Sequence, residues 1–127
     1  MNKAFLERMS ADELERYANT MGFSVLSAKG DDAKRDLIIS KRERCAELTV
    51  LGVELSIPMK RTMDQRIIDE VNKGSDDGYA RAINLILGDE QYERLIDACT
   101  EDDGLLDTAA LGYAATEIMT SDALKNF

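Results

Sequence analysis

The strongest constraint on the fold is a repeated helical pattern that is interrupted once, at Gly88. Apolar residues recur at three- and four-residue intervals on both sides of this glycine, as in helices that each bury one face. They are Tyr79, Ala82, Ile83, Ile86 and Leu87 before it, and Tyr92, Leu95, Ile96 and Cys99 after it. Glycine tolerates the left-handed backbone that often ends a helix, and Asp89 suits the start of the next one. Residues 75–99 therefore predict two short helices joined at a corner.

A second constraint lies between residues 47 and 58, where the apolar period shortens from about 3.6 residues to two. Apolar and polar residues alternate around a corner at Leu51 and Gly52, which predicts a β-hairpin or one bent strand, and Pro58 ends the pattern. A two-stranded hairpin is marginally stable alone, so it must pack on helices or pair its edge with another chain. The hairpin is therefore a candidate interaction edge. Its candidate partner-binding residues are Val53, Leu55 and Ile57.

Capping signals predict two helices near the N-terminus. Ser10 and Glu13 form a capping box, in which each side chain binds the other residue's backbone amide. The expected buried positions of this helix are Leu14, Tyr17, Ala18 and Met21. After an extended link, a second helix should begin at Asp31 or Asp32 and run to about Cys45. Its expected inward positions are Leu37, Ile38 and Cys45.

Two further helices are expected in the second half of the chain. One spans residues 59–72, with Met63, Ile67 and Val71 stacked at four-residue intervals on its buried face. The other is a long final helix that begins after Asp107, a residue type that caps helix N-termini. Its expected inward positions are Ala110, Leu111, Ala114, Ala115, Ile118 and Met119, and the expected anchors of the tail are Leu124 and Phe127.

Together these elements predict a mainly α fold with one β-hairpin. A chain of 127 residues is about one domain, and 44% apolar with 32% charged residues is typical of a folded protein. We expect residues 1–45 to form a helix-extension-helix subdomain. Residues 46–127 should form a domain that contains the hairpin and the remaining helices.

The net charge of −9 is concentrated in the C-terminal part of the chain. Residues 1–45 contain nine basic and eight acidic residues, whereas residues 76–127 contain three basic and twelve acidic residues. The acidic part should attract basic partners and disfavour nucleic acid. The chain has no run of 18 apolar residues and no apolar core near its start. We therefore expect neither a membrane span nor a signal peptide, and a cytoplasmic protein.

Residue types that carry catalysis or bind metals are scarce. The chain has no histidine, and its two cysteines, Cys45 and Cys99, are far apart, which excludes Ser-His and Cys-His nucleophiles and disfavours a zinc site. The acidic runs beside glycine lack the ligand spacing of an EF-hand, and no phosphate-binding glycine motif is present. We therefore expect no enzymatic activity, no metal and no cofactor, and interpret both cysteines as reduced, half-buried apolar residues.

Two tyrosines in the central helices allow two interpretations. Tyr79 and Tyr92 have the helical spacing of core residues, but tyrosine is also enriched among residues that dominate protein interfaces. They are therefore candidate partner-binding residues as well as candidate core residues. The six methionines allow the same two interpretations, as core filler or as an adaptable surface for a client.

Residues 10–45 resemble the small helix-extension-helix modules of the SAP, HeH and LEM type. The resemblance rests on Leu14, Gly22, Lys34, Leu37 and Ile38, which stand at family-like places. Some modules of this kind bind DNA through basic residues around the second helix. The candidate nucleic-acid-binding residues here are Lys34, Arg35, Lys41 and Arg42. Acidic residues are interleaved with them, which favours a solvated surface over a phosphate-binding one, so we expect no nucleic-acid binding.

Residues 47–120 resemble the tail assembly chaperones of long-tailed bacteriophages and prophages. The resemblance rests on the order of the segments LTVLGVELSIP, MDQRIIDEVNKG and YARAINLILGDEQYERLIDA, followed by an acid-capped final helix, with LGDEQY as the most family-like phrase. It implies a non-structural assembly factor in the cytoplasm of a bacterial host. Such a factor binds the long helical tape measure protein, keeps it soluble and helps the major tail protein to assemble around it.

Two other functions stay open at this point. One is a nucleic-acid-binding or regulatory protein of a prophage that acts through the N-terminal module. The other is a structural virion component, such as a head–tail joining protein. Self-association through the hairpin edge is compatible with each of these functions.

Overall fold

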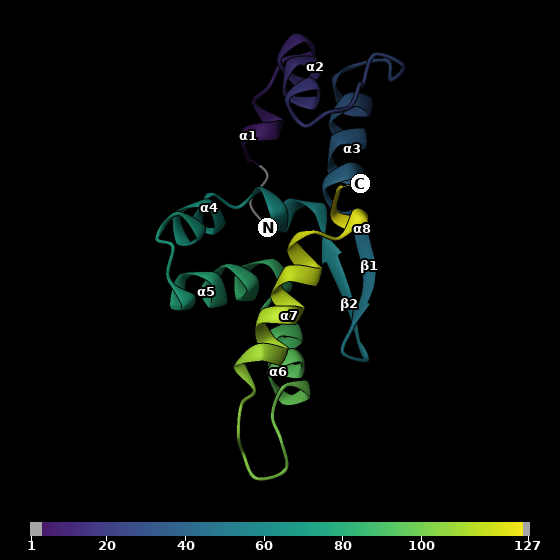
Figure 1. Ribbon diagram of the computed structural model, residues 1–127. Helices are drawn as coiled ribbons and strands as arrows, with labels where there is room; N and C mark the ends of the chain where they lie inside the picture. Colours follow the sequence, from purple (N-terminus) through teal and green to yellow (C-terminus); the bar gives the residue numbers. More distant parts are fainter. Residues whose placement is uncertain (1–3, 126–127) are drawn as a thin grey trace. The chain divides into compact units, whose positions relative to one another are not determined.

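Local caps and glycine turns define the elements of the computed structural model, which describes residues 4–125 (Figure 1). These residues are mainly helical and contain one antiparallel β-hairpin, as the sequence predicts. Contacts within the chain divide it into two units at the junction of Glu43 and Arg44, and each unit has its own apolar core. The expected boundary after Cys45 lies two residues further on, because strand β1 (Cys45–Val50) already begins at Cys45.

The N-terminal unit consists of short helices around a small core. The helices are α1 (Ala4–Glu7), α2 (Ala11–Thr20) and α3 (Asp31–Arg42). The capping box of α2 is confirmed, since Glu13 N donates to the Ser10 hydroxyl at 3.3 Å and Ser10 N donates to Glu13 Oε1 at 3.4 Å. The core residues are Leu6, Leu14, Ala18, Val25 and Ile38. Helix α1, which the sequence patterns did not predict, supplies Leu6.

Helix α3 differs from its prediction at both ends. Gly30, with φ +92°, occupies the N-cap position in place of Asp31 or Asp32, and no side chain caps the helix. The helix ends at Arg42, so Cys45 lies in β1 and is exposed instead of facing a helical core. The assumed helical spacing between Ile38 and Cys45 is therefore wrong, because the chain changes to a strand between them.

The buried face of α3 also differs from its prediction at Leu37. Lys34 and Ile38, four positions apart, point into the unit, and both are buried. Leu37 projects about 100° away from Ile38 on the helix. It is therefore 39% exposed instead of inward.

The C-terminal unit begins with the predicted hairpin, in which β1 pairs with β2 (Val53–Pro58) in antiparallel register. Its corner is Leu51 and Gly52, with φ values of +52° and +76°, and positive values at both positions are the mark of a type I′ turn. The residues that face the core alternate along both strands. They are Ala46, Leu48, Val50, Val53, Leu55 and Ile57.

The single helix predicted for residues 59–72 is wrong, because the segment breaks at Asp64. The elements there are a 3₁₀ turn, η1 (Met59–Met63), and a helix, α4 (Gln65–Asn72). The Asp64 carboxylate caps α4 by accepting from Arg66 N at 3.0 Å. Short polar residues that bind the backbone ahead of them begin helices more readily than they continue them. Met63 consequently leaves the predicted stripe and is 40% exposed, whereas Ile67 is buried.

The predicted corner at Gly88 is confirmed. It separates α5 (Asp76–Leu87) from α6 (Asp89–Ala98), and Gly88 has φ +80° and ψ 159°, a conformation that is nearly exclusive to glycine. Side chains from both sides of the corner close the end of α5, because the Arg61 guanidinium and the Gln91 amide donate to the Leu87 carbonyl. The corner thereby gives both helices fixed directions against the hairpin.

Asp107 caps the last long helix, α7 (Thr108–Met119), as predicted, and its Oδ1 accepts from Ala109 N at 2.9 Å. Helices α5 and α6 pack on β2, whereas α7 and α8 (Asp122–Lys125) pack on β1, so helices contact both strands (Figure 1). Leu124 packs against the resulting core, whereas Phe127 lies outside the described residues. The largest fully buried side chains of this core are Leu55, Ile57, Leu87, Leu95 and Ile118.

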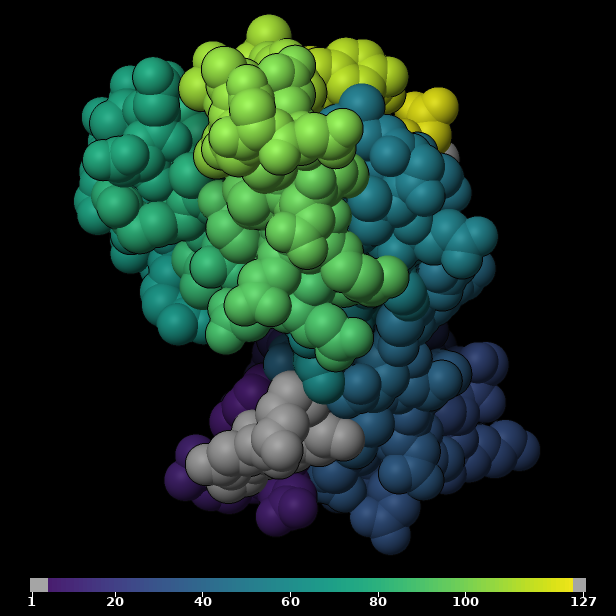
Figure 2. Space-filling view, turned by 90° about the horizontal axis from the view of Figure 1, so that it is seen from below, coloured from purple at the N-terminus to yellow at the C-terminus, as the bar shows by residue number. Residues whose placement is uncertain are grey.

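The acidic turn between α6 and α7 is exposed from residue 101 to residue 106. Figure 2 looks onto this turn and onto α6. Every helix within residues 4–125 falls short of the length and apolarity that crossing a membrane requires.

Candidate partner-binding groove

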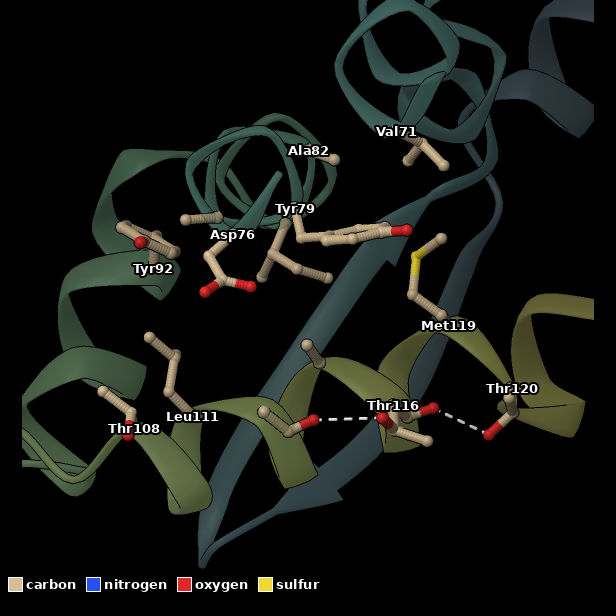
Figure 3. A pocket seen from close by; sticks show the side chains of 14 residues that line it. Val71, Asp76, Tyr79, Ala82, Tyr92, Thr108, Leu111, Thr116, Met119 and Thr120 are labelled. Atoms are coloured by element: carbon tan, nitrogen blue, oxygen red, sulfur yellow. Dashed lines mark hydrogen bonds between the residues drawn. The ribbon is translucent and has the colours of Figure 1, made fainter. Parts of the chain in front are cut away.

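An apolar groove of about 680 Å³ lies in the C-terminal unit, with α5 and α7 as its main walls (Figure 3). Its lining residues on α5 are Asp76, Tyr79, Ala80, Ala82 and Ile83, and those on or next to α7 are Thr108, Leu111, Gly112, Ala115, Thr116, Met119 and Thr120. Val71 of α4 and Tyr92 of α6 complete it. Apolar side chains from four helices converge in this groove, and no described element covers it.

The first wall is placed by the close packing of α4 on α5. Ser75 caps α5 by accepting from Gly78 N at 3.0 Å, and Gly78 is buried against the backbone of α4. A Cβ at residue 78 would collide with the Glu70 carbonyl oxygen, so the absence of a side chain permits this approach. Val71 is thereby brought beside α5, where it lines the groove together with Tyr79.

The second wall is placed by the composition of α7. Its buried positions are Ala114 and Ile118, and the lining positions occupy the neighbouring face of the helix. The side chains on that face are short, because it includes Gly112 and Ala115. Sequence reasoning identified the apolar side of α7 but assigned all of it to the core. The apolar stripe of α7 is wider than packing against one neighbour requires, and this width is the sequence signal for a groove.

Few polar groups of the groove are available to a ligand. Thr116 Oγ1 donates to the Gly112 carbonyl at 3.0 Å and Thr120 Oγ1 donates to the Thr116 carbonyl at 2.7 Å, so both hydroxyl hydrogens are used within α7 and the turn after it (Figure 3). The one charged lining residue among those described is Asp76, whose carboxylate points into the groove (Figure 3). It forms no ion pair with any described residue.

The two tyrosines that allowed two interpretations both line this groove. Tyr79 is 47% exposed, and its ring lies between Val71 and Met119 (Figure 3), which makes it an accessible wall residue and not a core residue. Tyr92 is half-buried and packs against the core while it also lines the groove. Met119, predicted to point inward, is 45% exposed at the same site.

The hairpin residues proposed as partner contacts occupy a different position. Leu55 and Ile57 are buried in the core, and Val53 is half-buried against it, because these alternate residues face the helices. The side chains of Leu55 and Ile57 are therefore unavailable to a partner in the folded unit, and that of Val53 is only partly accessible. The edge of β2 is also covered at Ser56, whose N–H donates to Gln91 Oε1 at 2.7 Å and whose carbonyl accepts from Gln91 Nε2 at 3.0 Å.

The outer edge of β1 differs from that of β2. The described residues form a two-stranded sheet, so none of them pairs with that edge as a third strand. The alternating side chains Glu47 and Thr49 on β1 are exposed. A charged residue on an edge strand is a device that disfavours pairing with another chain. The edge is consequently a weaker candidate for partner binding than the groove.

The basic residues considered for nucleic-acid binding are held by their own unit. Lys34 is 7% exposed, and its Nζ donates to the Val25 carbonyl at 3.1 Å and the Ala28 carbonyl at 2.6 Å, with Glu15 Oε1 at 3.3 Å. Lys34 therefore holds the extended link onto α3. The spacing of Lys34 and Ile38 on one helix face was the available signal that Lys34 points inward.

The other three basic side chains also contact the N-terminal unit. Arg35 donates to the carbonyls of Leu6 and Met9 at 2.8 and 3.3 Å. Arg42 donates to the Tyr17 hydroxyl at 2.7 Å and lies over the Phe5 ring, and Lys41 Nζ lies 5.8 Å from the centre of the Phe23 ring. These contacts join the helices of the unit and reduce the positive charge that the surface offers to phosphate.

Charged pairs lie at the ends of α4, where Arg66 binds Asp64 and where Arg81 and Lys73 bind Glu70. Hydrogen bonds from Arg81 and Lys73 lower the pKa of Glu70, and a hydrogen bond from Arg66 lowers the pKa of Asp64. Burial, and then the charge of Asp107, raise the pKa of the Cys99 thiol, which favours its neutral form. Within residues 4–125, no cluster of three or more His, Cys, Asp or Glu side chains is placed to hold a metal ion.

No protein-family model, curated protein or solved structure matches this chain.

Proposed function

We propose that this protein is a bacteriophage tail assembly chaperone that binds a helical client in the groove between α5 and α7. The observation that carries the proposal is the groove itself, an apolar surface built from four helices and left uncovered by the described residues. The resemblance of residues 47–120 to tail assembly chaperones supplies the client, the tape measure protein, and the associated major tail protein. The proposed activity is protein binding in the bacterial cytoplasm, without an enzymatic step.

Exposed methionine and tyrosine side chains suit this activity. Met119 is flexible and polarisable, and Tyr79 offers a large contact area at low entropic cost. A chaperone must bind many similar apolar segments of one long client, and adaptable side chains favour that over a single exact fit. The regulatory alternative lacks a comparable observation, because Lys34, Arg35 and Arg42 are engaged in contacts within the N-terminal unit.

Co-expression tests the proposal directly. The tape measure protein from the same genome is expressed alone, with the wild-type protein, or with an Ala115→Arg variant whose long side chain fills the groove. An Ala98→Arg variant, which adds the same charge at an exposed position of α6 outside the groove, is the matched control. Circular dichroism of each variant shows whether it remains folded.

The expected result is that the wild-type and Ala98→Arg proteins raise the soluble fraction of the tape measure protein and elute with it in size-exclusion chromatography. Ala115→Arg should lose both effects. If the wild-type protein changes neither the solubility nor the elution of the tape measure protein, the proposed function is wrong.

A further inference from the structure

We infer that the groove receives one face of an amphipathic α-helix from another protein, with a lysine or arginine at one end of that face paired with Asp76. The inference rests on the proposed function only in assigning a partner to the groove. It adds the length, the amphipathic face and the charge of the bound helix.

The length of the groove fits a helix of about three turns. Its lining on the α7 side runs from Thr108 to Thr120, which at a rise of 1.5 Å per residue corresponds to about 18 Å. A bound helix of about 12 residues would match that length, with apolar side chains at three- and four-residue intervals facing the groove. Gly112 and Ala115, which have little or no side chain, leave space for the side chains of the bound helix.

The walls of the groove favour a helix over an extended segment. Both main walls are helices, whose backbone amides and carbonyls bind one another within α5 and α7. An extended peptide would find no strand edge there, and its own N–H and C=O groups would be buried without partners. A helix satisfies its backbone internally and presents only side chains, so it can enter this groove without that penalty.

The charge of the occupant follows from Asp76. The carboxylate points into the groove, no basic residue lines the groove among the described residues, and Asp76 has no ion pair there (Figure 3). A cation on the occupant would therefore supply its counter-charge. A second copy of this chain is a poor source, because residues 76–127 contain twelve acidic and three basic residues, so two such surfaces repel each other.

Binding of synthetic peptides to the full-length wild-type protein, followed by fluorescence anisotropy, tests the inference. The probe is an amphipathic helical peptide of about 14 residues with leucine and alanine on one face and one lysine at an end of that face. Two versions carry the lysine at the N-terminal or the C-terminal end, since the groove has no symmetry that makes these equivalent. Matched peptides replace the lysine with glutamine, or place two prolines within the apolar stretch to prevent helix formation.

One lysine peptide should bind, its glutamine counterpart should bind about two- to fivefold more weakly, and the proline peptide should not bind. Asp76→Asn should remove the difference between lysine and glutamine peptides. Asp77→Asn, which removes the same charge one residue further on at an exposed position outside the lining, should preserve it. Ala115→Arg should abolish binding, and circular dichroism should show that each variant is folded.

Four results would overturn the inference. The first is that neither lysine peptide binds, and the second is that the proline peptide or a simple fatty acid binds as tightly as a lysine peptide. The third is that the lysine and glutamine peptides bind with equal affinity. The fourth is that the protein forms a dimer that Ala115→Arg dissociates. Because these measurements use no tape measure protein, the inference can fail while co-expression with the tape measure protein still succeeds. That combination would leave the proposed function standing with a different binding surface.

Discussion

Replacement of Gly88 by alanine tests the corner between α5 and α6 in two separable ways. The backbone at Gly88 lies in a region that costs other residues about 1–3 kcal/mol. An added Cβ would also lie 2.6 Å from an Arg61 guanidinium nitrogen and displace the group that donates to the Leu87 carbonyl, a charge-assisted hydrogen bond worth about 1.5–3 kcal/mol. The second cost is an upper bound, because the clashing group is the end of a flexible side chain and Gln91 also donates to the Leu87 carbonyl. Gly88→Ala should therefore lower the free energy of unfolding by about 1–6 kcal/mol, and Gly88→Val by at least as much.

Three comparison variants separate the two contributions in chemical denaturation followed by circular dichroism. Gly104→Ala has a similar positive φ of +89° but no atom within 4 Å of its added Cβ, so it should show the backbone cost alone. Gly112→Ala lies within a helix and should be neutral or stabilising by up to about 1 kcal/mol. In an Arg61→Ala background, the effect of Gly88→Ala should shrink toward that of Gly104→Ala. A neutral or stabilising Gly88→Ala would refute the assignment of the corner.

Other predictions concern the remaining packing and charge contacts. Gly78→Ala should destabilise the C-terminal unit by about 1–3 kcal/mol in the same denaturation assay, because the added Cβ collides with the rigid Glu70 carbonyl. Lys34→Met should lower the unfolding free energy by about 1–3 kcal/mol, since it leaves two carbonyls without their donor, and an unchanged value would contradict the inward position of Lys34. Hydrogen bonds from Arg81 and Lys73 lower the pKa of Glu70 in the folded protein. Glu70 should therefore contribute stability that is present above its unfolded pKa of 4.5 and is lost as the pH falls through its lower folded pKa. Thermal melts across acidic pH should therefore differ between wild type and Glu70→Gln above pH 4.5 and converge as the pH falls below the folded pKa of Glu70. DNA binding by the full chain should be absent at nanomolar protein in a gel-shift assay, and a salt-dependent shift would favour the regulatory alternative.

Local signals were sufficient to predict much of the fold. The capping box at Ser10, the cap at Asp107 and the corner at Gly88 each depend on residues within a few positions, so the sequence contains all the information they need. The hairpin was predictable for the same reason, from alternation around its corner. The break at Asp64 does not follow from apolar spacing, because the spacing of Met63, Ile67 and Val71 continues across a residue type that starts helices.

Tertiary contacts explain what could not be predicted. Helix α1 is too short to show a periodic pattern, and Leu6 becomes a core residue only when the rest of the unit surrounds it. Leu55 and Ile57 have the alternation of a strand face, but alternation does not say whether that face meets a partner or the chain's own helices. The groove depends on the approach of α4 to α5 at Gly78, a contact that periodicity along one helix cannot reveal.

The two units differ in how many of their interactions are already satisfied within the chain, and this difference locates the proposed binding activity. A group adds to affinity when its interactions are incomplete in the free protein, because a group that must first break an internal contact loses that energy on binding. In the N-terminal unit, the ammonium of Lys34 and the guanidinium of Arg35 each already contact backbone carbonyls. In the C-terminal unit, Tyr79 and Met119 remain about half exposed beside the unpaired carboxylate of Asp76. The free capacity for binding at the groove is therefore apolar and acidic, which suits a protein segment with a basic end.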